Sequence, residues 1–242
     1  MAGGNFIVMP AYNAGRTIER VFERIPETVR QRITRYVVVD DGSKDDTWEA
    51  ILRLQKQFPN LDPLRHPANR GYGAAEKTLL QHAVKEGAGI VILLHSDGQY
   101  SPEVIPAMLQ PFDRGQADLV MGSRMLGGGA LKGGMPLYKY VANKSLTALE
   151  NLAFGLRMAE YHSGFLVYNR KLLEAVPFEK LSDSFDFDLE MVVMAKIKGL
   201  RIREVAIPTI YADEESHLNP IKYGFNVLRV IRDYKLGRYG RL

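Results

Sequence analysis

The chain contains no cysteine among its 242 residues. This absence excludes a disulfide scaffold, a thiolate nucleophile and any zinc or iron–sulfur site built on cysteine, and it is compatible with a reducing cytoplasm. Long apolar segments are also lacking, because the most apolar run, at 89–94, is far shorter than the roughly 20 residues of a membrane-spanning helix. The N-terminus does not combine basic residues with a long apolar stretch as a signal peptide would. The sequence therefore predicts a soluble protein of the cytoplasm.

Neither sign of charge dominates the chain as a whole. With 46% hydrophobic and 25% charged residues the composition is close to the globular average, so a packed core is expected, and the length suits one domain or two small ones. The formal net charge is +4, but residues 219–242 contain six basic residues and one acidic residue, so the rest of the chain is nearly neutral. This distribution argues against binding of nucleic acid, which needs a basic face on the body of the protein.

The C-terminal segment 219–242 has the pattern of a basic amphipathic helix. Ile221, Phe225, Leu228 and Ile231 recur there at helical spacing among the basic residues. Two interpretations stay open. The helix docks on the core and shows its charges to solvent, or it lies on an anionic membrane surface, which attracts each basic residue with roughly 1 kcal/mol.

Strand and helix signals alternate from the N-terminus to about residue 121. Apolar runs at 6–9, 36–39, 90–94 and 117–121, with a short one near Leu64, predict strands, whereas 18–25, 47–58 and 74–86 predict helices and another helix opens at 101–103. This alternation predicts an α/β fold with a doubly wound parallel sheet, in which ligands bind at the carboxyl ends of the strands. Residues 122–134 are rich in glycine and predict a mobile loop, after which helix signals resume at Pro136.

Three of the predicted strands end in polar clusters. These clusters are Pro10-Ala11-Tyr12-Asn13, Asp40-Asp41-Gly42-Ser43 and His95-Ser96-Asp97-Gly98-Gln99. Turn formation alone explains any one of them, because Asp, Asn, Gly and Ser favour turns. Three clusters at neighbouring strand ends would gather on one edge of the sheet, where carboxylates can bind a nucleobase, ribose hydroxyls or a divalent cation held against a diphosphate. The pattern therefore predicts a ligand site at that edge.

Two further segments extend this pattern, Asn69-Arg70-Gly71-Tyr72-Gly73-Ala74-Ala75 and Val120-Met121-Gly122-Ser123-Arg124. Together with the three clusters, they resemble the inverting family-2 glycosyltransferases of the GT-A fold, in the right order over roughly residues 5–217. Within that family the chain is similar to the dolichyl- or polyprenyl-phosphate mannose and glucose synthase-like group. The resemblance implies a Rossmann-like, mostly parallel sheet flanked by helices in a GT-A domain at 1–218. Its nucleotide-binding half would span 1–122 and its acceptor half 123–218, followed by the basic helix at 219–242.

The resemblance assigns most of the strand-end residues to the sugar donor. It implies that Tyr12 packs near the nucleobase, that Asp40 bonds the base, and that Asp41 bonds the ribose or nearby backbone. His217 falls on a loop where related enzymes often carry a lysine that closes over the diphosphate, and it would replace that charge only partly. The other residues implied to line the nucleotide pocket are Pro10, Asn13, Gly42, Ser43, Asn69, Arg70, Gly73, Ser96 and Asp97.

The metal-binding D-x-D motif of the family falls at His95-Ser96-Asp97, so histidine replaces the first aspartate. The resemblance implies that Asp97 and Gln99 hold Mn²⁺ or Mg²⁺ against the two phosphates of the donor, where the metal offsets the charge of the departing nucleoside diphosphate. Three roles stay open for His95: a hydrogen bond to the ribose, a nitrogen ligand that favours Mn²⁺, or a structural histidine without a ligand.

The segment 160–165 resembles the family segment that lines the sugar and acceptor pocket beneath the metal. This similarity assigns His162 and Ser163 to the pocket. Gly164 follows them and lets the backbone approach a neighbour closely.

An acid at the start of the helix expected near residues 185–190 faces the acceptor in the family. Asp188 is preferred here to Asp186 and Glu190, although acidic residues also suit the N-terminus of a helix. Asp188 would act as a general base toward a hydroxyl acceptor. A lipid phosphate is already ionised and needs a cation instead, for which Arg124 is the first candidate because its fork suits phosphate. Poorer candidates are Lys132, Lys139 and Lys144.

Three functional hypotheses follow. The leading one is a metal-dependent inverting hexosyltransferase that moves a sugar from a UDP- or GDP-sugar to a polyprenyl phosphate, either free in the cytoplasm or peripheral at the cytoplasmic face of the membrane. The second keeps the transferase but gives it a soluble or glycan hydroxyl acceptor, with Asp188 as the base. The third is a nucleotide-sugar-binding protein that has lost catalytic activity because histidine occupies position 95. The sequence does not distinguish the base, the sugar or the oligomeric state.

Overall fold

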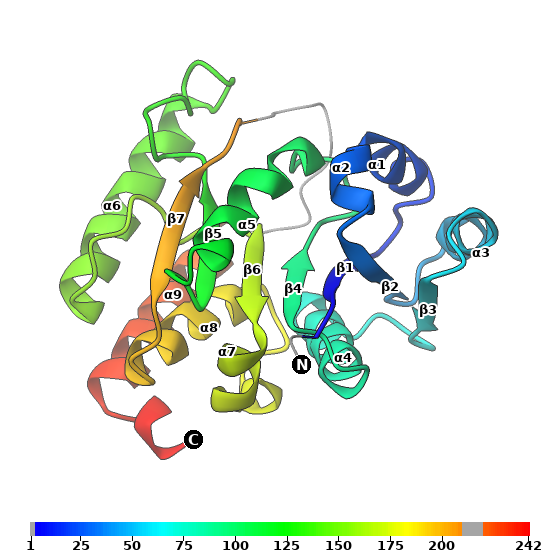
Figure 1. The fold of residues 1–242 in the computed structure, drawn as a ribbon. Coiled ribbons are helices and arrows are strands. Elements are labelled where there is room, and N and C mark those ends of the chain that lie inside the picture. The colour runs from blue at the N-terminus through cyan, green and yellow to red at the C-terminus, as the bar shows by residue number, and fades with distance from the viewer. Residues whose placement is uncertain (1–2, 210–219) are drawn as a thin grey trace.

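The computed structural model describes residues 3–209 and 220–242. In these residues a central sheet of seven strands has the order β3-β2-β1-β4-β6-β5-β7 (Figure 1). Neighbouring strands are parallel except β6, which runs antiparallel to both β4 and β5. The predicted α/β fold with a mostly parallel sheet is therefore confirmed. The strands are β1 (Asn5–Ala11), β2 (Ile33–Asp40), β3 (Leu61–Arg65), β4 (Ile90–Leu93), β5 (Leu119–Ser123), β6 (Leu166–Asn169) and β7 (Ile202–Ala206).

Helices cover both faces of this sheet. They are α1 (Ile18–Arg24), α2 (Glu27–Arg30), α3 (Thr47–Gln57), α4 (Tyr72–Lys85), α5 (Ile105–Asp113), α6 (Leu137–Phe154), α7 (Arg170–Ala175), α8 (Phe187–Ile197) and α9 (Pro220–Lys235). Buried residues of α1, α3 and α5 share one apolar cluster, and those of α4, α7, α8 and α9 share another. Alternate residues of β2 enter the two clusters, since successive side chains of a strand point to opposite faces.

Two strands, β6 and β7, were not predicted. β6 has only four residues, and its antiparallel pairing with β4 and β5 depends on segments far away in the chain. β7 is an edge strand with exposed Arg203 and partly exposed Glu204, so it lacks a continuous apolar run. The glycine-rich segment does connect β5 to α6 without a strand or helix, as predicted.

The predicted C-terminal helix is present as α9, but its buried face differs from the expected one. Val227 and Val230 are fully buried in the core, whereas Phe225 and Leu228 are exposed. The side chain of Ile221 lies outside those described. Phe225 and Leu228 of the predicted stripe therefore do not dock on the core, because α9 carries apolar residues on more than one side and packing selects which side turns inward.

Polar contacts also fix α9 to the core. Asp186, which is fully buried, accepts a hydrogen bond from Asn226 Nδ2 (2.9 Å) and pairs with Arg229 Nη2 (2.5 Å). The Tyr239 hydroxyl, beyond the end of α9, donates to Glu190 Oε1 (2.7 Å). The described part of the tail therefore docks on the core and uses one of its basic residues to neutralise a buried carboxylate.

No helix within residues 3–209 or 220–242 is long and apolar enough to cross a membrane.

The docking of α9 predicts that the same substitution has a large effect on stability at a buried position of this helix and a small effect at an exposed position. Val230→Asp should lower the free energy of unfolding by at least about 3 kcal/mol, because it buries a charge without a partner. Phe225→Asp, on the exposed side, should change it by no more than about 0.5 kcal/mol. Urea unfolding of both variants measures the difference. Equal stability of the two variants would contradict this docking.

Candidate active site

The three predicted polar clusters meet at one edge of the sheet. β1 lies between β2 and β4 in parallel register, so the carboxyl ends of the three strands are adjacent. The Asn13 amide donates to Ser43 Oγ (2.9 Å), and Asn13 Oδ1 accepts from the Lys44 amide (3.0 Å). The Ser96 hydroxyl donates to the carbonyl of Pro10 (2.8 Å). These bonds tie the three loops into one surface.

Asp40 ends β2 with one carboxylate oxygen that accepts a hydrogen bond and one that has no hydrogen-bond partner among the described residues. Oδ1 accepts from the Ser43 amide (2.8 Å), and the side chain is fully buried. Arg65 Nε lies 3.1 Å from Oδ2, yet the geometry is not that of a hydrogen bond, and Oδ2 has no hydrogen-bond partner among the described residues. A buried acceptor without a donor is costly unless a ligand satisfies it. Asp40 is thus poised to accept a hydrogen bond.

Asp41 instead holds the loop that follows β3. Its carboxylate accepts from the amides of Arg70 (3.0 Å) and Gly71 (3.1 Å) and contacts His66 Nδ1 (2.6 Å). Of the two roles expected for Asp41, these contacts match the one toward nearby backbone. Gly42 packs against the same loop, because a Cβ there would lie 2.5 Å from the Asn69 nitrogen.

The other residues predicted to line the nucleotide pocket divide into two groups. Asn69 and Arg70 are exposed on the loop that Asp41 holds, and Tyr12 is partly exposed. Gly73 is buried, and backbone atoms of another segment lie where a side chain would be. Its amide donates to the Asp183 carbonyl (3.0 Å), and a Cβ there would lie 2.9 Å from the Ser184 oxygen. Gly73 therefore connects the N-terminus of α4 to the segment just before α8.

His95 lies beside Tyr72 of α4 and Gly164. Its Nε2 lies 3.0 Å from the Tyr72 hydroxyl, and a Cβ on Gly164 would lie 2.7 Å from the same nitrogen. Tyr100 packs edge-on against the ring, with centroids 5.0 Å apart. Burial lowers the pKa of His95, so the ring is neutral at neutral pH. The absence of a side chain at Gly164 is what makes room for this histidine.

The residues predicted to bind metal offer one carboxylate. Asp97 is partly exposed, and its Oδ1 accepts from the Gln99 amide (3.0 Å). In the parts of the chain that the structure describes, no three His, Asp or Glu side chains gather as a metal site. A single carboxylate does suit Mg²⁺ or Mn²⁺ when substrate phosphates and water supply the other ligands. Asp97 thus fits a site that the donor completes, and the contact of His95 Nε2 with Tyr72 favours the structural role for that histidine.

Tyr72 joins His95 to Asp188, the predicted acceptor-side acid. The Tyr72 hydroxyl donates to Asp188 Oδ2 (2.9 Å), and Phe185 stacks on its ring with centroids 5.2 Å apart. Because the Tyr72 hydroxyl donates its hydrogen bond to Asp188, its oxygen accepts a hydrogen bond from His95 Nε2. Asp188 lies at the start of α8 as expected, whereas the contact of Tyr72 with both His95 and Asp188 was not predicted.

Glu76 was not predicted and lies beside Asp188 in the core. Glu76 is fully buried on α4, where it interacts electrostatically with Asp188. Burial raises the pKa of Asp188 to about 7 and raises that of Glu76 well above its ordinary value. Both oxygens of Glu76 and Oδ1 of Asp188 have no hydrogen-bond donor among the described residues. A proton bound by the pair would supply one.

Arg124 follows β5 and is held by Glu160. Its Nε donates to Glu160 Oε1 (3.0 Å), its amide donates to Oε2 (2.7 Å), and its Nη2 donates to the carbonyl of His162 (2.5 Å). Asn143 Nδ2, from α6, donates to the same Glu160 (2.9 Å). The predicted phosphate-binding arginine therefore stands next to a buried carboxylate, which sequence similarity did not reveal.

His162 is held from two sides. Its Nε2 lies 3.2 Å from Glu150 Oε2 on α6, and its Nδ1 lies 3.1 Å from the Tyr223 hydroxyl on α9. Ser163 is buried beside Tyr100. The structure thus brings Arg124 and His162 together.

The weaker cation candidates differ in exposure. Lys132 and Lys144 are exposed, and Lys139 is partly exposed. His217 lies outside the described residues.

The shared proton predicts a pH dependence that depends on Glu76. Because folding raises the pKa of Asp188 from 3.8 to about 7, the stabilisation is full below about pH 4 and is lost as pH rises through about 7. Glu76→Gln removes the like charge and adds a donor. The free energy of unfolding of this variant, relative to that of the wild type, should therefore rise by roughly 1–3 kcal/mol between pH 5 and pH 8, since one pKa unit corresponds to about 1.4 kcal/mol.

Urea unfolding at the two pH values measures this gain. The matched control is Glu174→Gln on α7, at an exposed carboxylate paired with Arg170, which should leave the pH dependence of the wild type unchanged. Parallel pH profiles for Glu76→Gln and the wild type would rule out the shared proton.

Comparison with known proteins places the chain in a family. Residues 6–176 match the model of glycosyl transferase family 2. The UDP-N-acetylglucosamine–dolichyl-phosphate N-acetylglucosaminyltransferase of Methanococcus voltae is 28% identical over 96% of both chains. The dolichol-phosphate mannosyltransferase of Pyrococcus furiosus is 27% identical over 82% of this chain and 54% of its own length. These names confirm the predicted resemblance to the polyprenyl-phosphate sugar synthase group.

Solved structures share the fold. Glucosyl-3-phosphoglycerate synthase from Mycobacterium tuberculosis, in complex with Mn²⁺, UDP and phosphoglyceric acid, superposes with a TM-score of 0.68 at 19% identity, over 98% of this chain and 79% of its own. The predicted GT-A fold is thereby confirmed. The chain belongs to glycosyl transferase family 2 and is a hexosyltransferase.

Proposed function

We propose that this enzyme transfers a hexose from a UDP- or GDP-linked sugar to a polyprenyl or dolichyl phosphate. The relatives from Methanococcus voltae and Pyrococcus furiosus, named for dolichyl-phosphate acceptors, support the acceptor class. The superposed synthase, crystallised with Mn²⁺ and UDP-glucose, supports the donor class and a divalent metal.

The observation that carries the donor assignment is the buried Oδ2 of Asp40, which has no hydrogen-bond donor among the described residues. Uracil and guanine both present an imino N–H, and either would satisfy this oxygen. Tyr12, Asn13, Ser43 and the exposed loop of Asn69 and Arg70 surround the same strand edge. We therefore place the nucleoside there, with Asp40 as its base-reading residue.

The diphosphate is proposed to lie toward Asp97 and Gln99, which end the adjacent strand. Asp97, with Gln99 beside it, would hold a divalent metal that offsets the charge developing on the departing nucleoside diphosphate. A phosphate oxygen of the acceptor attacks the anomeric carbon in line with that leaving group, so the new bond forms on the opposite face of the sugar and its configuration inverts.

The protonation of Asp188 favours a phosphate acceptor. A carboxyl group with a pKa of about 7 that shares a proton with Glu76 is protonated in much of the population at neutral pH. A phosphomonoester, with a second pKa near about 6, is mostly ionised and attacks without a base. Arg124 is the proposed cation for it, and the phosphate would share its guanidinium with Glu160.

A hydroxyl acceptor is the second candidate, because one observation also suits it. A pKa near 7 is favourable for a general base, and Asp188 Oδ1 has no partner among the described residues. The third candidate, a nucleotide-sugar-binding protein without activity, rests on the replacement at His95 alone. It is weakened because His95 is held by Tyr72 and Gly164, while the carboxylate of Asp97 is retained.

Calorimetry with UDP and GDP, each with Mn²⁺, Mg²⁺ or a chelator, tests the donor site. One nucleotide should bind, more tightly with metal. Asp40→Asn should weaken this binding by at least about tenfold in every condition, since a hydrogen bond to a charged group contributes roughly 1.5–3 kcal/mol. Asp97→Ala should remove only the enhancement by metal. Asp113→Asn, at an exposed carboxylate paired with Arg32, is the control. Unchanged affinity in Asp40→Asn would refute the assigned base contact.

Asp188→Asn separates the two acceptor classes. For a phosphate acceptor we expect the rate of sugar transfer to fall by less than about tenfold, because no proton is removed during attack. Loss of a general base from a hydroxyl reaction would cost roughly 10²–10⁴-fold. Single-turnover transfer to a short isoprenoid phosphate, with folding checked by circular dichroism, gives the rate. A loss of the larger size on that acceptor would contradict the proposed chemistry.

A further inference from the structure

Arg65 lies beside the carboxylate oxygen of Asp40 that has no hydrogen-bond donor among the described residues. β3 pairs with β2 in parallel, with Arg65 in register with Asp40, so the two side chains leave the sheet on the same face. Arg65 Nε lies 3.1 Å from Asp40 Oδ2 without a hydrogen bond between them. A ligand at this point would therefore meet a hydrogen-bond acceptor next to a hydrogen-bond donor.

Trp48 holds the guanidinium of Arg65 in place. Arg65 Cζ lies over the indole ring of Trp48, 5.1 Å from the ring centroid, and Trp48 is the second residue of α3. Such a cation–π contact is strongest with tryptophan and suits the planar guanidinium. Asp40 is fully buried, whereas the side chain of Arg65 keeps 48% of its area exposed. The guanidinium is thus supported by a ring on one side and accessible to a ligand.

The nucleobases differ in the hydrogen-bonding pattern that they would present to this pair. Uracil offers an imino N–H next to a carbonyl oxygen, and guanine offers the same arrangement. Cytosine and adenine offer the inverse, a ring-nitrogen acceptor next to an amino group. Against Asp40 and Arg65, the inverse pattern would place acceptor against acceptor and donor against donor. A base with an imino N–H beside a carbonyl satisfies both side chains at once.

We infer that Arg65 is a second base-reading residue, which donates to the carbonyl oxygen beside the imino N–H that Asp40 Oδ2 accepts. Trp48 is the positioning residue for this contact. The inference rests on the proposed function, because it assigns a further residue to the nucleoside placed against Asp40. It restricts the sugar donor to nucleotides with a keto base and gives the physical reason for that restriction.

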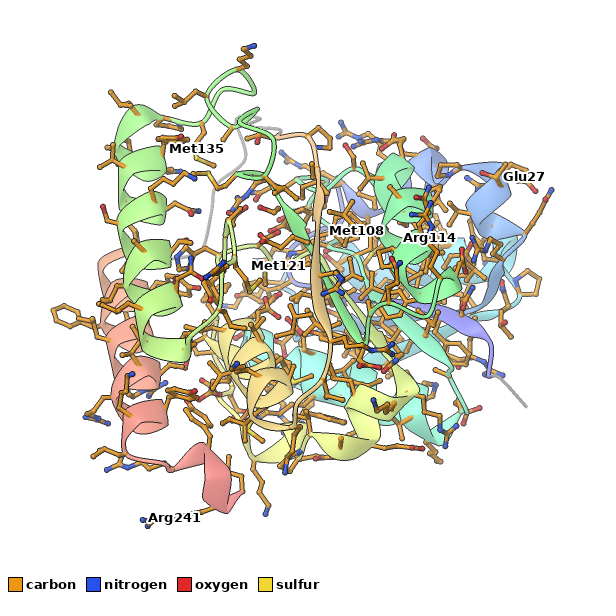
Figure 2. The ribbon with its side chains drawn as sticks, turned by 60° about the vertical axis from the view of Figure 1, so that its left-hand side comes forward. Glu27, Met108, Arg114, Met121, Met135 and Arg241 are labelled. Carbon is orange, nitrogen blue, oxygen red and sulfur yellow. The ribbon has the colours of Figure 1, made fainter. Side chains whose placement is uncertain are left out.

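This pair of base-reading residues lies on elements far from α6 and α9. β3 is an edge strand with α3 beside it, on the opposite side of the molecule from α6 and α9 (Figure 1). Figure 2 shows Glu27, in the helix that precedes β2, on the opposite side from Arg241 near the C-terminus. Residues of α6 and α9 contact Glu160 and His162. A substitution of Arg65 should therefore change nucleotide binding without disturbing those contacts.

Calorimetry with paired nucleotides tests the role of Arg65 on the full chain. The wild type should bind UDP or GDP at least about 100-fold more tightly than the amino counterpart, CDP or ADP, because the inverse pattern leaves both side chains unpaired. Arg65→Met should lower this ratio at least about tenfold. Trp48→Leu should lower it about fivefold, and should lower it no further when combined with Arg65→Met. Arg53→Met, at an exposed arginine paired with Glu19, is the matched control and should leave the ratio unchanged.

Two outcomes would overturn the inference. One is equal binding of the keto and amino nucleotides by the wild type. The other is an unchanged ratio in Arg65→Met, including an equal loss of affinity for both nucleotides, which would show that Arg65 only attracts the diphosphate.

Transfer to a short isoprenoid phosphate tests the proposed function separately. Binding of UDP or GDP without transfer would defeat the proposed function and leave the affinity ratio to decide the role of Arg65. Absence of binding by all four nucleotides would defeat both.

Discussion

Two carboxyl groups, Glu76 on α4 and Asp188 at the start of α8, are buried beside each other. The two carboxyl groups do not both carry a full negative charge, because ionising both side by side in an apolar setting has a large free-energy cost. The shared proton therefore stabilises the contact between α4 and α8. Tyr72 extends it to His95 through 2.9 Å and 3.0 Å contacts, so the strand end that carries Asp97 is connected to the start of α8. The position of His95, and with it the departure from the usual metal motif, follows from this cluster.

The same junction connects the donor edge to the acceptor side through backbone. Asp41 fixes the amides of Arg70 and Gly71, and two residues later the Gly73 amide donates to the carbonyl of Asp183. Lys77 Nζ reinforces this contact at Asp183 Oδ1 (2.7 Å). A nucleoside bound against Asp40 would thus lie next to Asp41, which holds the loop that leads to Gly73 and its contact with Asp183. Such short, rigid connections position two substrates without a large motion, which is how oriented groups lower a reaction barrier.

The sequence was sufficient to predict that the polar residues after β1, β2 and β4 meet at one edge, and insufficient to predict the partners of Arg124 and Asp188. Polar residues after β1, β2 and β4 were predictable because parallel strands place their carboxyl ends together whatever the details of packing. The pairing of Arg124 with Glu160, and of Asp188 with Glu76, joins segments 36 and 112 residues apart and leaves no local signal. For α9, helical spacing identified a helix but not its orientation, because Val227 and Phe225 are both apolar and only the core decides between them. Sequence reasoning also missed β6 for a non-local reason, its antiparallel pairing.

Helix α6 shows how fold and function can be separated within one element. Its buried side carries two polar residues that contact the segment before β6: Asn143 Nδ2 donates to Glu160, and Glu150 Oε2 lies 3.2 Å from His162 Nε2 without a hydrogen bond. The exposed apolar residues on its other side are Leu137, Tyr138, Val141, Leu149 and Leu152. They contribute little to folding, since their surface stays in contact with water in the folded chain as it does in the unfolded one. Selection for stability alone therefore does not account for five large apolar residues there.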